Sequence, residues 1–224
     1  MSASRQTVIF DLDGTLVDTG ADLIAAANAS FRDMGLGDLL DPEADKATAF
    51  RGARAMLRLG LGRTGAVDET VVDREYPGLL AHYDRAVCVH SRLYPGAVEA
   101  AEALRGRGVA LGIATNKPFG LADKLLRALG VRDHFGPLVG ADSLPVRKPD
   151  PAHLWEAVDL AGGARERTLL VGDTETDRTT SRNAGVPSVL VTFGPEGRDI
   201  ARLAPEALLD HFDDLPDLVD RLLG

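Results

Sequence analysis

Two aspartates near the start of the chain are spaced so that their side chains can act together. In Asp11-Leu12-Asp13-Gly14-Thr15, the first and third side chains share one face while the chain stays extended, and Gly14 permits a sharp turn. Two carboxylates therefore emerge side by side from an apolar run. An Asp-Gly pair is also a common turn sequence, so this segment alone is explained as well by a strand that ends in a turn.

A hydroxyl and a lysine occur in two later segments. The apolar run that ends at Ala114 is followed by Thr115 and Asn116, and the start of a helix there would offer backbone N–H groups to an anion. A plain helix cap explains the same residues. In Arg147-Lys148-Pro149-Asp150-Pro151 the prolines keep the backbone extended, which leaves the Lys148 side chain free to point across neighbouring strand ends. A solvated loop lysine is the simpler interpretation of that segment.

A fourth segment adds two more acids. The apolar run 168–171 leads into Gly172 and Asp173, and Asp177 follows four residues later. In isolation Asp173 could be a helix-capping residue. The sequence has four lysines, at positions 46, 117, 124 and 148. Because lysine is this rare, Lys148 is less readily explained as an ordinary surface residue.

The four segments become informative when they are taken together, because the strands of a parallel sheet end in one crevice. Asp11, Asp13 and Asp173 would then face Thr115 and Lys148. Carboxylates ~4 Å apart repel by roughly 1 kcal/mol in water and ~4 kcal/mol at an effective dielectric constant of 20, so three of them imply a compensating cation. Oxygen ligands favour Mg²⁺. A metal, an anionic nucleophile, a second carboxylate and a lysine–threonine anion pocket together indicate phosphoryl transfer.

The elements that must position these residues alternate between strand and helix. Short apolar runs predict buried strands at 7–10, 109–114, 138–140, 168–171 and 188–193. Apolar residues at helical spacing predict helices around 121–129 and 154–161, followed by Gly130 and Gly162 as helix stops. The alternation predicts an α/β fold, a doubly wound, Rossmann-like parallel sheet with helices on both faces.

One interval breaks this alternation. From about Leu16 to Arg92 the sequence has helical periodicity at 23–31, 44–61 and 70–85, without a convincing strand. We expect a helical insert at 17–92, joined by two linkers to a catalytic α/β core formed by 1–16 and 93–224. A helical lid of this kind can close over a crevice, exclude water and select among leaving groups.

Composition limits the classes of function. The chain has 224 residues, 45% of them hydrophobic and 26% charged, and its formal net charge of −9 opposes binding to a nucleic-acid backbone. The single cysteine, Cys88, excludes an internal disulfide framework. The apolar runs are far shorter than a membrane span, and the first residues lack the pattern of a signal peptide. We therefore expect a cytoplasmic protein, a monomer or homodimer, that acts on a small phosphorylated metabolite without nucleic acid or membrane.

The same four segments resemble the ordered motifs of a known enzyme superfamily. The strings FDLDGTLVDT (10–19), IATNKP (113–118), RKPDP (147–151) and VGDTETD (171–177) are similar to the motifs of the haloacid dehalogenase superfamily of phosphohydrolases. The resemblance covers essentially the whole chain, including a helical cap after the first motif. VDTGADL after that motif and TNKP at 115–118 are similar to the phosphoglycolate phosphatases of this superfamily. The stretch 178–182 is more polar than expected for these relatives.

The resemblance implies a role for each site residue. Asp11 would be the nucleophile that forms an aspartyl-phosphate, and Asp13 would protonate the leaving alcohol and then activate water. Mg²⁺ would be held by the carboxylates of Asp11 and Asp173 and the backbone carbonyl of Asp13, with Asp177 as a nearby acid. Lys148 would be a third catalytic residue, which neutralises the nucleophile and the phosphate. The residues expected to bind the substrate are Thr15, Thr115, Asn116 and Lys148 in the core and Arg51 and Gly52 in the cap.

Several alternatives remain at this point. Arg51, Arg54, Arg58 and Arg63 also fit a solvated basic face without any substrate role. The substrate could be 2-phosphoglycolate or another small phosphate compound, such as a nucleoside monophosphate, a sugar phosphate or pyrophosphate. A receiver-like, non-catalytic module also gathers aspartates, threonine and lysine around Mg²⁺, but it is about half this length. A carbon–halogen hydrolase would lack Asp13, because it needs no acid for the leaving group.

Overall fold

The chain consists of two compact units. A computed structural model describes residues 5–65 and 67–224. One unit contains the stretch up to Val17 together with Leu93–Gly224, and the other is Asp18–Arg92. The chain passes between them through two very short strands, β2 (Val17–Asp18) and β3 (Arg92–Leu93), which form a two-stranded sheet. No helix in the described part of the chain is long and apolar enough to cross a membrane.

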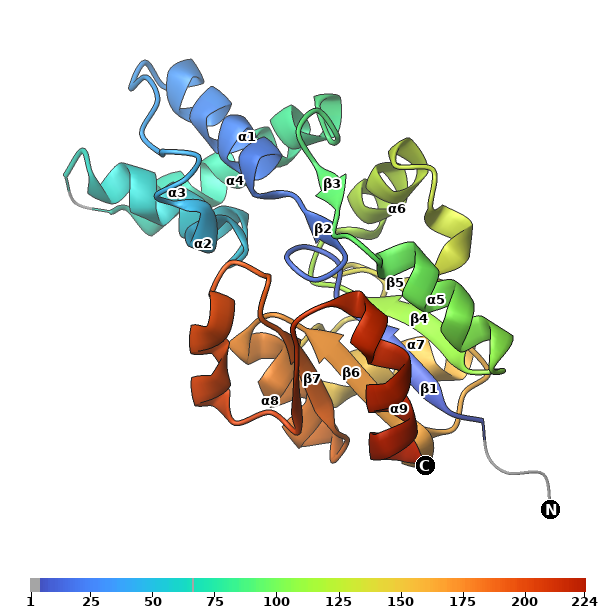
Figure 1. Ribbon diagram of the computed structural model, residues 1–224. Coiled ribbons are helices and arrows are strands. Elements are labelled where there is room, and N and C mark those ends of the chain that lie inside the picture. Colours follow the sequence, from blue (N-terminus) through green and yellow to red (C-terminus); the bar gives the residue numbers. More distant parts are fainter. Residues whose placement is uncertain (1–4, 66) are drawn as a thin grey trace. The chain divides into compact units, whose positions relative to one another are not determined.

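The larger unit is built on a six-stranded sheet (Figure 1). Its order is β5-β4-β1-β6-β7-β8, and every pairing in it is parallel. The strands are β1 (Thr7–Phe10), β4 (Ala110–Ala114), β5 (Leu138–Val139), β6 (Thr168–Gly172), β7 (Ser188–Val191) and β8 (Ala207–Leu209). The central strands β1, β4 and β6 are buried along their whole length, which explains their unbroken apolar runs.

The parallel α/β fold predicted from the sequence is confirmed. The helices of this unit are α5 (Ala97–Gly106), α6 (Phe119–Ala128), α7 (Pro151–Leu160), α8 (Glu175–Ala184) and α9 (Leu215–Leu223), with short 3₁₀ turns between them. Figure 1 shows helices on both faces of the sheet, with α5 and α9 on one and α7 on the other. A core cluster joins α7 to the central strands through Leu154, Ala157 and Val158, which pack against Ile9 and Leu170.

Local signals explain where these helices begin and end. Asp150 accepts a hydrogen bond from the Ala152 backbone N–H, and Pro151 occupies the first turn of α7. Gly130 and Gly162, the predicted stops, follow α6 and α7 with φ of 73° and 65°. The edge strand β8 was not predicted, because Ala207–Leu209 is short and only partly buried.

The unit Asp18–Arg92 is helical. It contains α1 (Gly20–Asp33), α2 (Lys46–Ala49), α3 (Ala53–Gly62) and α4 (Glu69–Arg85). The prediction of continuous helix at 44–61 was wrong in one respect, because the helix is interrupted between α2 and α3. Gly52, the N-cap residue just before α3, has φ of 93° there, a conformation that L-residues with a side chain rarely adopt.

Helices α1 and α3 approach closely where Gly60 faces Phe31. A Cβ added at residue 60 would lie 2.2 Å from Cζ of Phe31, whose side chain is fully buried. Two helices can come this close only where one of them has no side chain, so the packing of this unit depends on Gly60.

We predict that Gly60→Ala destabilises the protein by about 1–3 kcal/mol, because the buried ring must move. Gly78→Ala is the matched control: Gly78 is exposed within α4, and an added Cβ there meets nothing within 4 Å. The control should be neutral or stabilising by up to about 1 kcal/mol. Urea unfolding followed by circular dichroism measures both, and equal effects of the two substitutions would contradict the packing argument.

Candidate active site

The predicted acids gather at the carboxyl ends of adjacent strands. Asp11 follows β1, and its backbone N–H donates to the carbonyl of Val171 in β6 at 2.9 Å. Asp173 directly follows β6. Both side chains are buried, with 8% and 1% of the residue exposed. The register of the sheet therefore brings together two carboxylates that are 162 positions apart in the chain.

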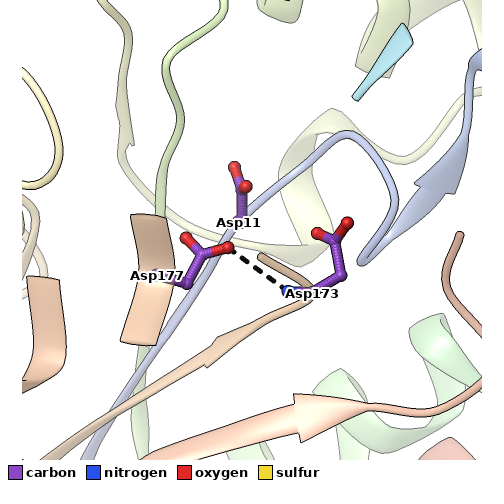
Figure 2. A group of neighbouring side chains, drawn as sticks. All are labelled: Asp11, Asp173 and Asp177. Carbon is purple, nitrogen blue, oxygen red and sulfur yellow. Dashed lines mark hydrogen bonds between the residues drawn. The ribbon is translucent and has the colours of Figure 1, made fainter. Parts of the chain in front are cut away.

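Asp177, in the first turn of α8, completes a group of three acids. One carboxylate oxygen from each of Asp11, Asp173 and Asp177 lies within 4.8 Å of the others. Figure 2 shows the three side chains, with Asp177 joined to the backbone nitrogen of Asp173 by a hydrogen bond. The sequence alone did not define a role for Asp177.

Lys148 supplies the positive charge inside this group. Its Nζ lies 3.0 Å from Oδ1 of Asp11 and 2.7 Å from Oδ1 of Asp177, and its side chain is 1% exposed. The side chain of Asn116 holds the lysine segment in place, because Nδ2 donates to the carbonyl oxygen of Lys148 at 2.9 Å. Lys148 thus reaches across the strand ends as the proline-flanked sequence suggests.

Burial controls the protonation of the cluster. The pKa of Asp11 is raised to about 6, mainly by burial; the charge of Lys148 opposes this rise and the neighbouring Asp177 adds to it. The pKa of Asp173 is also raised well above its ordinary value, first by burial and then by Asp177 and Asp11. Burial disfavours the charged form of Lys148, but the charges of Asp11 and Asp177 outweigh it and raise the pKa of the lysine.

The hydrogen bonds distinguish the three acids. Oδ2 of Asp177 accepts from the Thr174 hydroxyl at 2.6 Å and from two backbone N–H groups, and its Oδ1 accepts from Lys148. Thr174 and Asp177 form a capping box that starts α8. Both oxygens of Asp177 are therefore already engaged.

Asp173 differs, because one of its oxygens is left over. Oδ1 accepts from the Thr15 hydroxyl at 2.7 Å, whereas Oδ2 is buried and has no hydrogen-bond partner within the described residues. A buried carboxylate oxygen without a partner is costly unless a ligand satisfies it. Asp11 and Asp173 therefore fit a hard cation with oxygen ligands, while Asp177 is better suited to position Asp173 and Lys148.

Asp13 lies outside this group of three and has a lysine of its own. Nζ of Lys117 donates to Oδ1 and Oδ2 of Asp13 at 2.9 and 3.1 Å, and the lysine side chain is 4% exposed. No role was predicted for Lys117 from the sequence. The sequence does single this residue out, because Lys117 is one of four lysines and directly follows the predicted site residues Thr115 and Asn116.

The charges of the site do not balance. The four acids Asp11, Asp13, Asp173 and Asp177 carry −4 when ionised, and Lys117 and Lys148 carry +2, which leaves −2. A divalent cation would neutralise this remainder. In the metal-free protein the raised pKa values of Asp11 and Asp173 let protons do part of that work.

The remaining predicted residues fall into two groups. Thr115 is buried at the end of β4, where its hydroxyl accepts from the Lys117 backbone N–H at 3.2 Å, and Thr15 contacts Asp173. Arg51 and Gly52 are exposed residues of the other unit, just before α3. Their substrate role stays a prediction.

Comparisons with known proteins agree on one family. The model of the family described as haloacid dehalogenase-like hydrolase matches residues 8–191. A phosphoglycolate phosphatase of Mesorhizobium japonicum is 38% identical over 222 residues, covering 98% of this chain and 97% of that protein. The phosphoglycolate phosphatase of Rhodospirillum rubrum is 40% identical over 217 residues, with coverage of 95% and 90%.

Solved structures show the same fold. A crystal structure of a predicted phosphoglycolate phosphatase from Haemophilus somnus has a TM-score of 0.83 at 28% identity, covering 97% of this chain and 99% of that one. A putative phosphoglycolate phosphatase from Lactobacillus delbrueckii has a TM-score of 0.86 at 25% identity, covering 99% of each chain.

We predict that stabilisation by Mg²⁺ grows as the pH rises. The folded-state pKa values of Asp11 and Asp173 lie above the ordinary value of 3.8, at about 6 for Asp11. In the metal-free protein the stability contributed by these groups is therefore present below pH ~4 and is lost as the pH rises through their raised pKa values. Metal binding needs the ionised carboxylates. A Mg²⁺ concentration of about 100 times the Kd at pH 8 should raise Tm by about 5–10 °C at that pH. The same concentration should raise Tm by much less at pH 5.

Thermal unfolding with and without Mg²⁺ at the two pH values measures this difference. Asp173→Asn is the informative variant, because it removes the carboxylate with the unsatisfied oxygen and should lose the response at both pH values. Equal Tm increments at pH 5 and pH 8 in the unsubstituted protein would rule out a metal site made of these acids.

Proposed function

The chain belongs to the haloacid dehalogenase-like hydrolase family and is a phosphatase, and we propose that it hydrolyses 2-phosphoglycolate to glycolate and inorganic phosphate. The observation that carries the chemistry is the buried group of Asp11, Asp173 and Asp177 around Lys148. The choice of substrate is supported by the relatives that match nearly the whole chain and are phosphoglycolate phosphatases. Because the chain belongs to this hydrolase family, the alternative of a receiver-like binding module has no support.

The proposed cofactor is Mg²⁺, held by the carboxylates of Asp11 and Asp173 and the carbonyl of Asp13. The unsatisfied Oδ2 of Asp173 and the net charge of −2 support this assignment. When bound, the ion would neutralise the negative charge that the phosphoryl oxygens and Asp11 bring together.

Asp11 acts as the nucleophile in the proposed reaction. Its pKa of about 6 leaves it mostly ionised at neutral pH, and Lys148 at 3.0 Å helps to hold that charge. A carboxylate oxygen attacks phosphorus, an O–P bond forms to give an aspartyl-phosphate, and the ester O–P bond breaks. Covalent catalysis of this kind divides one difficult displacement into two easier ones.

Asp13 moves the protons. In its acid form it donates a proton to the departing glycolate oxygen, and as a carboxylate it then removes a proton from the water that attacks the aspartyl-phosphate. The products are inorganic phosphate and Asp11 in its original form. Thr115 and the Asn116 backbone orient the phosphoryl oxygens, while Lys148 offsets their charge.

The helical unit Asp18–Arg92 is the proposed cap, which selects the leaving group. In this proposal Arg51 and the backbone around Gly52 contact the substrate. We also propose a cytoplasmic location, in keeping with a chain that has one cysteine and thus no disulfide framework. The substrate is in any case a small phosphorylated molecule.

The first test is the substitution Asp11→Asn. Because an amide cannot form the aspartyl-phosphate, turnover should fall by at least about 10⁴-fold. The protein should still fold, as shown by an unchanged circular dichroism spectrum. Asp217→Asn, at an exposed position in α9, is the control and should keep full activity. Near-normal turnover of Asp11→Asn would refute the nucleophile assignment.

The second test is a substrate series at saturating Mg²⁺. We expect kcat/KM for 2-phosphoglycolate to exceed the values for a nucleoside monophosphate, a sugar phosphate and pyrophosphate by at least about 10-fold. Initial rates of phosphate release measure all four. Should 2-phosphoglycolate rank below the others, the substrate assignment fails while the phosphatase assignment stands.

A further inference from the structure

We propose that Lys117 is the specificity-determining residue that binds the carboxylate of the substrate next to its ester oxygen. The inference rests on the proposed function, since it names the group that distinguishes 2-phosphoglycolate from other phosphate esters. It starts from the ion pair between the buried Lys117 side chain and the partly exposed Asp13, which the proposed reaction leaves unexplained.

The two lysines of the site are bound to different acids. Lys148 bonds Asp11 and Asp177, the acids around the reacting phosphorus, whereas Lys117 bonds both oxygens of Asp13. Asp13 is the proposed acid for the leaving oxygen. The positive charge of Lys117 therefore lies on the side of the site where the leaving group departs.

The distances are short enough for contact with the leaving group. Proton donation places an Asp13 oxygen about 3 Å from the ester oxygen, and Lys117 Nζ lies one further hydrogen bond away, at 2.9 Å from Oδ1. In 2-phosphoglycolate the carboxylate carbon is two covalent bonds from the ester oxygen. A carboxylate so close to the ester oxygen comes within hydrogen-bond reach of the same Nζ.

Electrostatics makes this contact selective. Without Lys117 the substrate carboxylate would enter a site lined by acids with no positive charge beside it, and the negative charges would repel in this low-dielectric place. An ammonium group has three donors on a rotatable head, so it can be shared between Asp13 and a second carboxylate. A neutral leaving group gains nothing from it, and the phosphoryl contacts are the same for every phosphate ester.

The backbone fixes Lys117 on both sides. Its N–H donates to the Thr115 hydroxyl at 3.2 Å, and its carbonyl accepts from the Ala141 N–H at 2.9 Å. Lys117, Asp13 and Thr115 all belong to the α/β unit. The contact with the substrate carboxylate is therefore made by the unit that also holds the acids, and it adds to the selection proposed for Arg51 and the cap.

The test compares pairs of ligands that differ in one carboxylate. Ethyl phosphate is 2-phosphoglycolate with a methyl group in place of the carboxylate. The corresponding non-hydrolysable pair is 3-phosphonopropionate and propylphosphonate. The variants are Lys117→Met, which removes the charge, Lys117→Arg, which keeps it, and Lys124→Met as a control at an exposed lysine of α6. Arg51→Ala is measured beside them.

We expect Lys117→Met to lower kcat/KM for 2-phosphoglycolate about 10- to 100-fold more than that for ethyl phosphate, the loss typical of one charged hydrogen bond. Its Kd for 3-phosphonopropionate, measured by calorimetry with Mg²⁺, should rise by a similar factor while that for propylphosphonate stays within about 3-fold. Lys117→Arg should recover part of the preference, and Lys124→Met should match the unsubstituted protein.

Two outcomes would overturn the inference, and each is distinct from a failure of the proposed function. If Lys117→Met lowers kcat/KM for 2-phosphoglycolate and for ethyl phosphate by the same factor, Lys117 only positions Asp13. If Arg51→Ala removes the whole preference and Lys117→Met none, the carboxylate is bound by the helical unit. In both cases the unsubstituted enzyme still prefers 2-phosphoglycolate. An unsubstituted enzyme that shows no preference over ethyl phosphate contradicts the proposed function and the inference together.

Discussion

The active site is constrained by the repulsion among the carboxylates that the sheet brings together in a buried place, because this repulsion must be balanced by positive charge. Asp11, Asp173 and Asp177 have oxygens within 4.8 Å of one another, and the environment raises the pKa values of the first two. Such a cluster is stable only if other charges oppose it. Lys148 supplies one of these charges, and the residual −2 of the whole site calls for a divalent cation.

The sheet can bring these acids together because its order differs from the order of the chain. Strand β1 lies between β4 and β6, so the first acids of the sequence are flanked by Thr115 on one side and Asp173 on the other. Each strand contributes one chemical group at its carboxyl end. Phosphoryl transfer needs such an arrangement, because positioning and charge neutralisation do most of its work.

The sequence predicted the central strands and the meeting of Asp11 and Asp173 at their carboxyl ends, because both have strong local signals. The roles of these residues stay predictions. Buried strands have unbroken apolar runs, and the acids follow those runs directly. It could not predict which lysine binds which acid, since this depends on side chains that reach across the strand ends, as Lys117 and Lys148 do. The edge strand β8 and the break at Gly52 were missed because short or half-buried segments have no distinctive periodicity.

The capping box of α8 has a consequence for local opening of the molecule. Oδ2 of Asp177 closes the first turn of the helix, and Oδ1 holds Lys148. If this turn frays, the lysine loses an anchor and Asp11 loses the orientation of its counter-charge. Helix end and active site must then open as one cooperative segment, and amide protons in the first turn of α8 should exchange with solvent only when the site itself is disrupted.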